Sequence, residues 1–183
     1  MPNPFNTSDR AIEVHSLIFF DVDADIFKLI DGQIKQPTNV KNTFDAWHLL
    51  PSKKPSFVLP PLKSNYVELM GANGSIDATT ILTGEETYGL REDSLEFMIQ
   101  DYDTVTEANK TFEALKRQIA TYLHGKDKLV ALASDPTVFY RGRWEIDDMH
   151  TDEYWSVITL KYTLEPHGWF TTRNSQGDLV RTM

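Results

Sequence analysis

The chain has 183 residues, with 18 Lys and Arg against 27 Asp and Glu, and a formal net charge of −9 at pH 7. This length suits one hydrophobic core and is short for two. The acidic balance disfavours binding to nucleic acid, and the absence of cysteine excludes disulfides, thiolate metal sites and a cysteine nucleophile. No apolar run is long enough to span a bilayer and no secretory signal is visible, so we expect no membrane insertion.

The first strand candidate covers residues 13–20 and runs into the segment LIFFDVDAD. An apolar strand that ends in D-x-D resembles the first motif of the haloacid-dehalogenase phosphatases, in which Asp21 would be the nucleophile and Asp23 the general acid. Asp25 stands where that family has Thr or Val, and the crossover helices of that fold have no counterpart in the sequence that follows. A hairpin with solvated aspartates is the simpler interpretation.

Residues 37–62 contain five of the nine prolines, and proline interrupts strand ladders. The segment is nevertheless too apolar for a solvated linker, since it includes Phe44, Trp47, Leu49, Leu50, Phe57, Val58 and Leu59. We therefore expect an arm, stiffened by proline, that lies against its own domain or against a neighbouring subunit. Trp47 is the predicted anchor in a subunit contact, because Trp is enriched among interface hot spots. The alternative is that Trp47 packs inside its own subunit.

The only strong helix signal lies between Thr104 and His124. Thr104 and Glu107 have the spacing of a capping box. Apolar side chains then recur at the intervals of one helical face, at Ala108, Phe112, Leu115, Ile119 and Leu123. Gly125 can take the left-handed conformation that ends a helix.

The remaining elements show the period-two pattern of strands with one wet and one dry face, which is typical of antiparallel sheets. These strands are predicted at 26–30, 65–70, 94–99, 129–133, 138–147 and 157–164. We therefore predict a mainly β fold with one α-helix, an antiparallel β-sandwich with an extended proline-rich arm. Residues 1–183 are expected to form one domain, with a short C-terminal tail at about 168–183.

The sequence offers no convincing catalytic or metal site. The five histidines are scattered, and His150 among nearby acidic residues is more simply a solvated hairpin end than a metal ligand. No nucleophile elbow, zinc-protease motif or phosphate-binding glycine loop occurs. We predict no catalytic residues, no metal, no cofactor and no enzymatic activity.

Several short motifs occur in order between residues 43 and 166. The first group is Phe44, Trp47, His48, Leu49 and Pro51, then Lys54-Pro55, then Gly71, Gly74, Asp77 and Thr79. The second group is Tyr88 to Arg91, Leu123 to Lys126, Asp135-Pro136, and Tyr140 to Arg143. Together they resemble the N-terminal domain of the siphophage distal-tail family, with its W-x-x-W-H-L-x-P, x-x-R-P, P-G-x-x-G-x-x-D-x-T, Y-x-x-R, L-H-G-K and D-P…Y-x-G-R blocks. The departures are Phe44 for Trp, Lys54 for Arg, Met70 for Pro, and Ala78 before the Thr.

This resemblance implies a structural protein of the virion, made in the host cytoplasm and located at the phage tail tip or baseplate. In that family a ring, taken to be hexameric, joins the tail tube protein to the tail-associated hub or lysin used in host attachment. A neck or tube protein of related fold is an alternative, as is the phosphatase. Longer members append a C-terminal carbohydrate-binding domain, and the residues after 168 are too few for one, so we expect no glycan binding.

Two sets of residues are predicted to matter for this role. The candidates for the subunit interface are Phe44, Trp47, His48, Leu49, Leu50, Pro51, Phe57 and Leu59. The candidates for structural turns are Gly71, Gly74, Asp77, Gly125, Asp135, Pro136 and Gly142.

Overall fold

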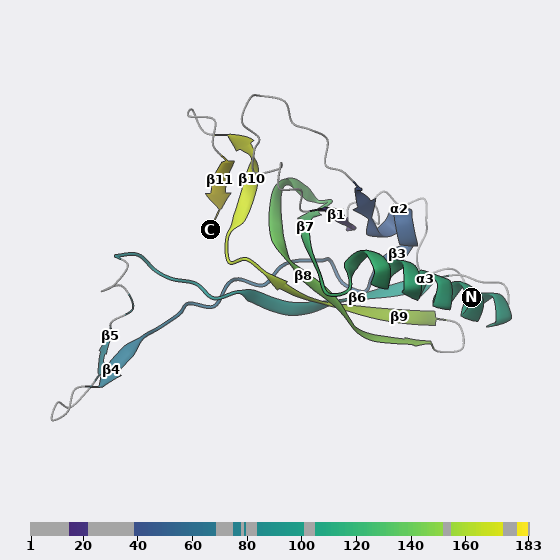
Figure 1. Ribbon diagram of the computed structural model, residues 1–183, viewed down its shortest axis with the longest axis horizontal. Helices are drawn as coiled ribbons and strands as arrows, with labels where there is room; N and C mark the ends of the chain where they lie inside the picture. The colour runs from purple at the N-terminus through teal and green to yellow at the C-terminus, as the bar shows by residue number, and fades with distance from the viewer. Residues whose placement is uncertain are drawn as a thin grey trace.

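Antiparallel strand pairing organises the chain in the computed structural model (Figure 1). The structure describes residues 15–21, 39–68, 75–77, 79, 84–100, 105–151, 155–173 and 179–182. Within them, nine strands form one sheet with the order β2-β1-β7-β8-β9-β6-β3, and β10 and β11 extend it from β8. A separate two-stranded sheet pairs β4 with β5.

The bounds of the elements follow the chain. The strands are β1 (Leu17–Asp21), β2 (Lys41–Asn42), β3 (Leu49–Pro51), β4 (Tyr66–Glu68), β5 (Ser75–Asp77), β6 (Arg91–Gln100), β7 (Lys126–Leu132), β8 (Asp135–Thr151), β9 (Trp155–Leu164), β10 (Gly168–Arg173) and β11 (Leu179–Thr182). The helices are α2 (Thr43–Trp47) and α3 (Val105–Leu123). The predicted mainly β, antiparallel class with one long helix is confirmed.

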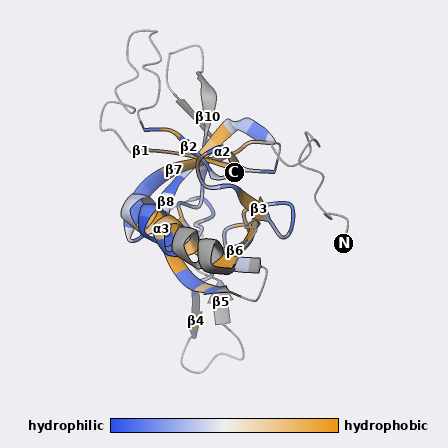
Figure 2. Ribbon diagram, turned by 90° about the vertical axis from the view of Figure 1, so that its right-hand side faces the viewer, coloured by the Kyte–Doolittle hydropathy of each residue, from blue (hydrophilic) through white to orange (hydrophobic). Residues whose placement is uncertain are grey.

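The long strand β8 changes neighbours along its length and so curls the sheet. Its first half pairs with β7 and β10, and its second half pairs with β9 as far as Thr151 opposite Ser156. The register with β9 shifts between Ile146 and Asp148, which is the signature of a bulge that increases local twist. Seen from the end, the sheet curls beside α3 (Figure 2).

The main core fills the space between α3 and the curled sheet. The predicted apolar face of α3 is buried here, through Phe112, Leu115, Ile119 and Leu123. These side chains share one cluster with residues of β1, β6, β8 and β9, in which Trp144 is fully buried. Gly125 follows the helix with φ of 69°, the left-handed conformation expected of a glycine that ends a helix. Thr104 of the predicted capping box lies outside the described residues.

A smaller cluster lies on the other face of the sheet. Leu129, Ala131 and Phe139 are buried there, with Phe20 and Trp169 packed against them. The alternation within 138–147 puts Phe139 on the same face as Arg141 and Arg143, which is predicted to be the wet face, but Phe139 is buried and this part of the prediction is wrong. Trp169 covers it, because residues predicted as a tail form β10, which pairs with β8.

The short helix α2 was not predicted. The Asn42 side chain accepts hydrogen bonds from the backbone N–H groups of Phe44 at 2.8 Å and Asp45 at 3.4 Å, as an N-cap does. Thr43 is buried, and its hydroxyl accepts a hydrogen bond from the backbone N–H of Leu17 at 3.0 Å. This bond fixes α2 to the start of β1.

Candidate assembly surface

A two-stranded arm leaves the body of the molecule (Figure 1). One side is the chain from Val58 to β4, and the other includes β5 and residues 84–90. The two sides are joined by hydrogen bonds from Lys63 N–H to the Thr87 carbonyl at 2.8 Å and from Gly89 N–H to the Pro61 carbonyl at 2.7 Å. The β4–β5 ladder pairs the chain again at the tip, so the arm has backbone pairing near its base and at its end.

The arm carries most of the exposed large apolar side chains of the described residues. They are Val58, Leu59, Leu62, Tyr66, Val67 and Leu90, and Val40 is the one that lies elsewhere. Leu59 has 82 % of its surface exposed and Tyr66 has 60 %. Folded monomers rarely expose apolar side chains in such a concentrated group unless a partner covers them. We call this group the apolar arm surface.

The base of the arm is held by an aromatic socket. The Phe57 ring lies 5.1 Å from the ring of Tyr140 and 5.4 Å from that of Tyr162, in edge-on geometry. The next residue, Val58, donates its backbone N–H to the Tyr162 hydroxyl at 3.2 Å. Tyr162 belongs to β9 and is fully buried, so the arm begins at a point fixed to the sheet.

A buried arginine completes this attachment. Arg91, with 2 % of its surface exposed, donates from Nη1 to the Val58 carbonyl at 2.8 Å and from Nε to the Pro166 carbonyl at 2.9 Å. Its guanidinium also lies 5.0 Å from the centre of the Tyr140 ring. Side chains from the body thus satisfy both backbone polar groups of Val58.

Substitution of Arg91 by Lys should loosen the base of the arm, because a single ammonium cannot reproduce donors set at two positions of a planar fork. We expect the free energy of unfolding to fall by about 1–3 kcal/mol. Trypsin should cut faster after Lys63, an exposed arm residue. Limited proteolysis followed by mass spectrometry measures this rate. An unchanged cleavage rate after Lys63 would show that Arg91 does not hold the arm.

The predicted interface residues divide into two groups. Trp47, Leu49 and Leu50 have at most 3 % of their surface exposed and lie in the interior of their own chain. Their side chains are covered within their own chain, as in the alternative considered for Trp47, and a role for these residues at a subunit interface stays a prediction. Trp47 contacts the rings of Phe19 and Tyr122 at 6.4 and 5.5 Å between centroids.

The other interface candidates are less buried. Phe44 is half-buried and meets the exposed His48 edge-on, Pro51 is half-buried, and Phe57 fills the aromatic socket. Leu59 is the exposed member of the set, and its role in a subunit contact stays a prediction. The arm predicted at 37–62 therefore splits: its first part packs on the sheet, and the projecting arm begins at Val58. The exposed segment LPPLKSNYV was the signal for the second part.

The predicted turn residues occupy different settings. Asp135 and Pro136 open β8 directly after the turn at 133–134, and the Asp135 carboxylate accepts from the Thr137 N–H at 3.3 Å. Gly142 lies within β8 rather than in a turn, which corrects that assignment. Asp77 pairs with Tyr66 in the β4–β5 ladder. Gly71 and Gly74 lie outside the described residues.

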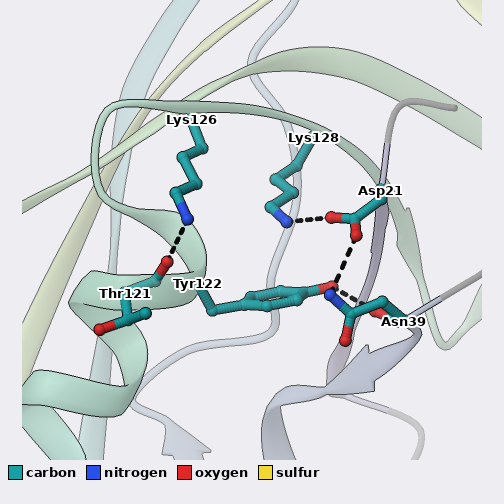
Figure 3. A network of polar contacts seen from close by, with 6 residues as sticks. All are labelled: Asp21, Asn39, Thr121, Tyr122, Lys126 and Lys128. Carbon is teal, nitrogen blue, oxygen red and sulfur yellow. Dashed lines mark hydrogen bonds and ion pairs between the residues drawn. The ribbon is translucent and has the colours of Figure 1, made fainter. Parts of the chain in front are cut away.

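Asp21, the proposed phosphatase nucleophile, belongs to a polar network that links β1 to the body (Figure 3). Its carboxylate forms an ion pair with the buried Lys128 and accepts a hydrogen bond from the Asn39 side chain at 2.9 Å. The Lys128 ammonium lies 3.7 Å from the centre of the Tyr122 ring, and the Tyr122 hydroxyl donates to the Asn39 carbonyl at 2.6 Å. The network thus satisfies a buried cation and joins two distant segments.

The surroundings of Asp21 differ from those of the nucleophile in the phosphatase motif. β1 is antiparallel to both β2 and β7, whereas the motif requires a parallel sheet. Asp23 lies outside the described residues. His150 is exposed and its ring lies 3.0 Å from Asp148, and no group of three potential metal ligands occurs among the described residues.

The Asp21 network predicts a dependence of stability on pH. Burial opposes ionisation of Asp21, but hydrogen bonds from Lys128 and Asn39 and the charges of Lys128 and Lys126 outweigh it and hold its pKa below the usual value. Because the pKa is lower in the folded state, this stabilisation is present above the unfolded pKa of about 3.9 and is lost as the pH falls through the folded value.

Asp21→Asn should therefore be less stable than the wild type at pH 7, and the difference should shrink at acid pH, as the pH falls through the lowered pKa and Asp21 itself becomes protonated. Urea unfolding at both pH values measures it. Asp148→Asn, at an exposed pair with His150, serves as the control and should change stability little. A difference between wild type and Asp21→Asn that does not depend on pH would contradict the assignment.

Comparisons with known proteins bear on the fold. The sequence matches no family model, and no curated protein matches it. Across the described helices, none is long and apolar enough to cross a membrane. The structure is similar to the crystal structure of SPP1 Dit, described as a paradigm of the hub adsorption apparatus in phages that infect Gram-positive bacteria. The TM-score is 0.51 and the sequence identity 15 %.

The match covers 71 % of this chain and 49 % of SPP1 Dit, so the chain spans about half the length of that protein. At this identity the likeness shows a shared fold. The class that the fold defines is therefore a mainly β domain of the kind found in SPP1 Dit.

Proposed function

We propose that the protein is a structural component of a phage tail, with a role in the adsorption apparatus comparable to that of Dit, and that it has no catalytic role. The observation that carries this proposal is the apolar arm surface on a fold shared with a tail hub protein. Apolar side chains that are exposed in the isolated chain, as those of the arm are, are expected on an element that a partner covers in an assembly.

We further propose that copies of the chain associate through the arm into a closed ring at the tail tip, six copies on the resemblance to the distal-tail family. When two different surfaces of successive copies are in contact, the copies form a closed ring if the rotation from one copy to the next is a whole fraction of a full turn. The tail tube protein on one side, and a tail-associated hub or lysin on the other, are the proposed partners in the virion.

The firm attachment of the arm supports a role in binding. Phe57, Arg91 and Tyr162 fix its direction before any partner is present. A surface that is ordered in advance loses less conformational entropy on association. The exposed leucines of the arm, Leu59 and Leu62, are then available to a partner at low cost.

The experiment is a comparison of wild type with Leu59→Ser/Leu62→Ser. Size-exclusion chromatography with light scattering gives the mass across a concentration series, and negative-stain images show rings. We expect wild type to form a ring and the double variant to stay monomeric with an unchanged melting temperature. Ser64→Ala, an exposed arm residue, is the control and should assemble as wild type does. A wild type that stays monomeric at every concentration, or a double variant that still forms rings, would overturn the proposal.

A further inference from the structure

The outer edge of β6 is paired over only part of its length. β3 pairs with the end of β6, and the last backbone bond on this edge joins the Ser52 N–H to the Glu96 carbonyl at 3.0 Å. The chain returns to the start of β6 at Val58, whose carbonyl accepts from Arg91 at 2.8 Å. Between these two points, no strand of the described residues pairs with the outer edge of residues 92–95.

This stretch directs backbone polar groups outwards. Neighbouring residues of a strand turn their N–H and C=O groups to opposite edges. Because the Glu96 carbonyl faces the side of β3, the backbone groups of Ser94 and Glu92 face the same side. The Ser94 N–H donates to the side chain of Asp93, the preceding residue, at 2.8 Å. A chain that pairs with β6 here finds the donors and acceptors of an open strand edge.

A cavity of about 430 Å³ lies against the same stretch. The segment 51–56 forms one wall, and residues 93–97 of β6 form much of the other. The segment is held in place, since the Ser52 hydroxyl donates to the Glu96 carboxylate at 2.7 Å and Pro55 is buried. The volume lies in the range of about 300–1,000 Å³ that is usual for ligand sites. Walls that are fixed in advance lose less conformational entropy when a ligand binds.

Two lysines stand at the end of the cavity nearer β3. Lys53 and Lys54 directly follow Ser52, and both are exposed and line the cavity. Neither takes part in the ion pairs formed among the described residues. A strand that pairs with residues 92–95 has to end beside Ser52, because β3 occupies the edge beyond it. A chain end placed there is favoured if it is a carboxylate and disfavoured if it is an ammonium group.

We propose that this cavity binds the C-terminal end of an extended peptide from a partner protein, which adds a short strand to residues 92–95 of β6 and places its carboxylate beside Lys53 and Lys54. Main-chain hydrogen bonds to Ser94 supply affinity, as in other cases of strand addition to a sheet edge. The contacts between carboxylate and ammonium groups fix the direction of the peptide, parallel to β6. The inference does not depend on the proposed tail role, since it rests on β6 and the segment 51–56 alone.

A pair of peptides tests the recognition of the carboxylate. The probe is N-acetyl-Ala-Ala-Val with a free C-terminal carboxylate, and its match is the same peptide with a C-terminal amide. NMR titration of isotope-labelled protein gives the dissociation constants and identifies the backbone amides that shift. We expect the carboxylate peptide to shift the amides of Ser94 and its neighbours in β6. The amide peptide should bind about tenfold or more weakly, as the loss of a charge-assisted hydrogen bond predicts.

Variants of exposed residues test the two walls separately. Lys53→Gln/Lys54→Gln should weaken binding of the carboxylate peptide by about tenfold and abolish the preference for it over the amide. Lys63→Gln is the matched control, because Lys63 is exposed on the arm and does not line the cavity. Asp93→Ala should tighten binding by about two- to fivefold, since it removes the acceptor that occupies the Ser94 N–H.

Three outcomes would overturn the inference. The first is the absence of shifts in β6 with the carboxylate peptide at millimolar concentration. The second is equal affinity for the carboxylate and amide peptides, which would show that Lys53 and Lys54 do not receive a carboxylate. The third is a set of shifts confined to residues away from the cavity. None of these outcomes bears on the proposed tail role, which the oligomeric state of the wild type tests independently.

Discussion

Replacement of Gly142 by alanine should destabilise the protein by about 4 kcal/mol or more, in the range reserved for severe core disruptions. A Cβ atom at Gly142 would lie 2.2 Å from the carbonyl oxygen of Thr163 and 2.7 Å from the Cα of Leu164. Both are backbone atoms of β9, which pairs with Gly142 through Leu164. The methyl group therefore fits only if the two central strands of the sheet separate.

Gly125→Ala is the matched control for this prediction. Gly125 has φ of 69°, but a Cβ there meets no atom within 4 Å. The cost is then conformational alone, about 1 kcal/mol. Urea denaturation followed by circular dichroism measures both variants. Equal losses of stability at the two glycines would show that the close approach of β9 does not limit residue 142.

Trp47→Ala should lower the free energy of unfolding by about 3–5 kcal/mol, as the truncation of a buried large aromatic does. Trp47 has 3 % of its surface exposed and joins α2 to the core through Phe19 and Tyr122. Because these contacts lie within one chain, the loss should be the same at every protein concentration. An interface anchor would instead make the loss depend on concentration.

Leu59→Ala is the counterpart on the arm. With 82 % of its surface exposed, Leu59 contributes little to the folded monomer, and the substitution should leave its stability within about 0.5 kcal/mol of wild type. Thermal melts at low and high protein concentration compare the two variants. A Trp47→Ala protein that melts like wild type when dilute would restore Trp47 as an interface residue.

The elements with regular local patterns were predictable from the sequence. The face of α3 that includes Phe112 and Ile119 is specified by three- and four-residue spacing, and the structure buries it as expected. The strands around Phe97 and Leu160 follow from alternation alone. In each case the spacing of apolar residues within one segment specifies which face is buried, and the surface that covers this face only has to be apolar.

The failures arise where a distant segment decides the outcome. Phe139 is buried because Trp169 of β10 covers it, and nothing within β8 indicates that cover. The placement of residues 39–62 depends in the same way on distant segments: Trp47 contacts Tyr122 of α3 and Phe19 of β1, whereas Leu59 keeps 82 % of its surface exposed. The close approach of Thr163 to Gly142 likewise depends on how β9 lies against β8, which the sequence of β8 alone does not indicate. The start of α2 is a different case, because Asn42 is a local signal of a type favoured at helix N-caps, yet α2 was not predicted.

The way Val58 is held has a mechanical consequence. A pull on the arm reaches the body through Arg91 of β6 and Tyr162 of β9, neighbouring strands joined by ten residue pairs. When a force runs along such strands, the hydrogen bonds of the ladder share the load instead of opening one after another. Pro166, bonded to the same arginine, passes part of the tension to the segment before β10. An arm attached in this way can bear tension without peeling an edge strand from the sheet.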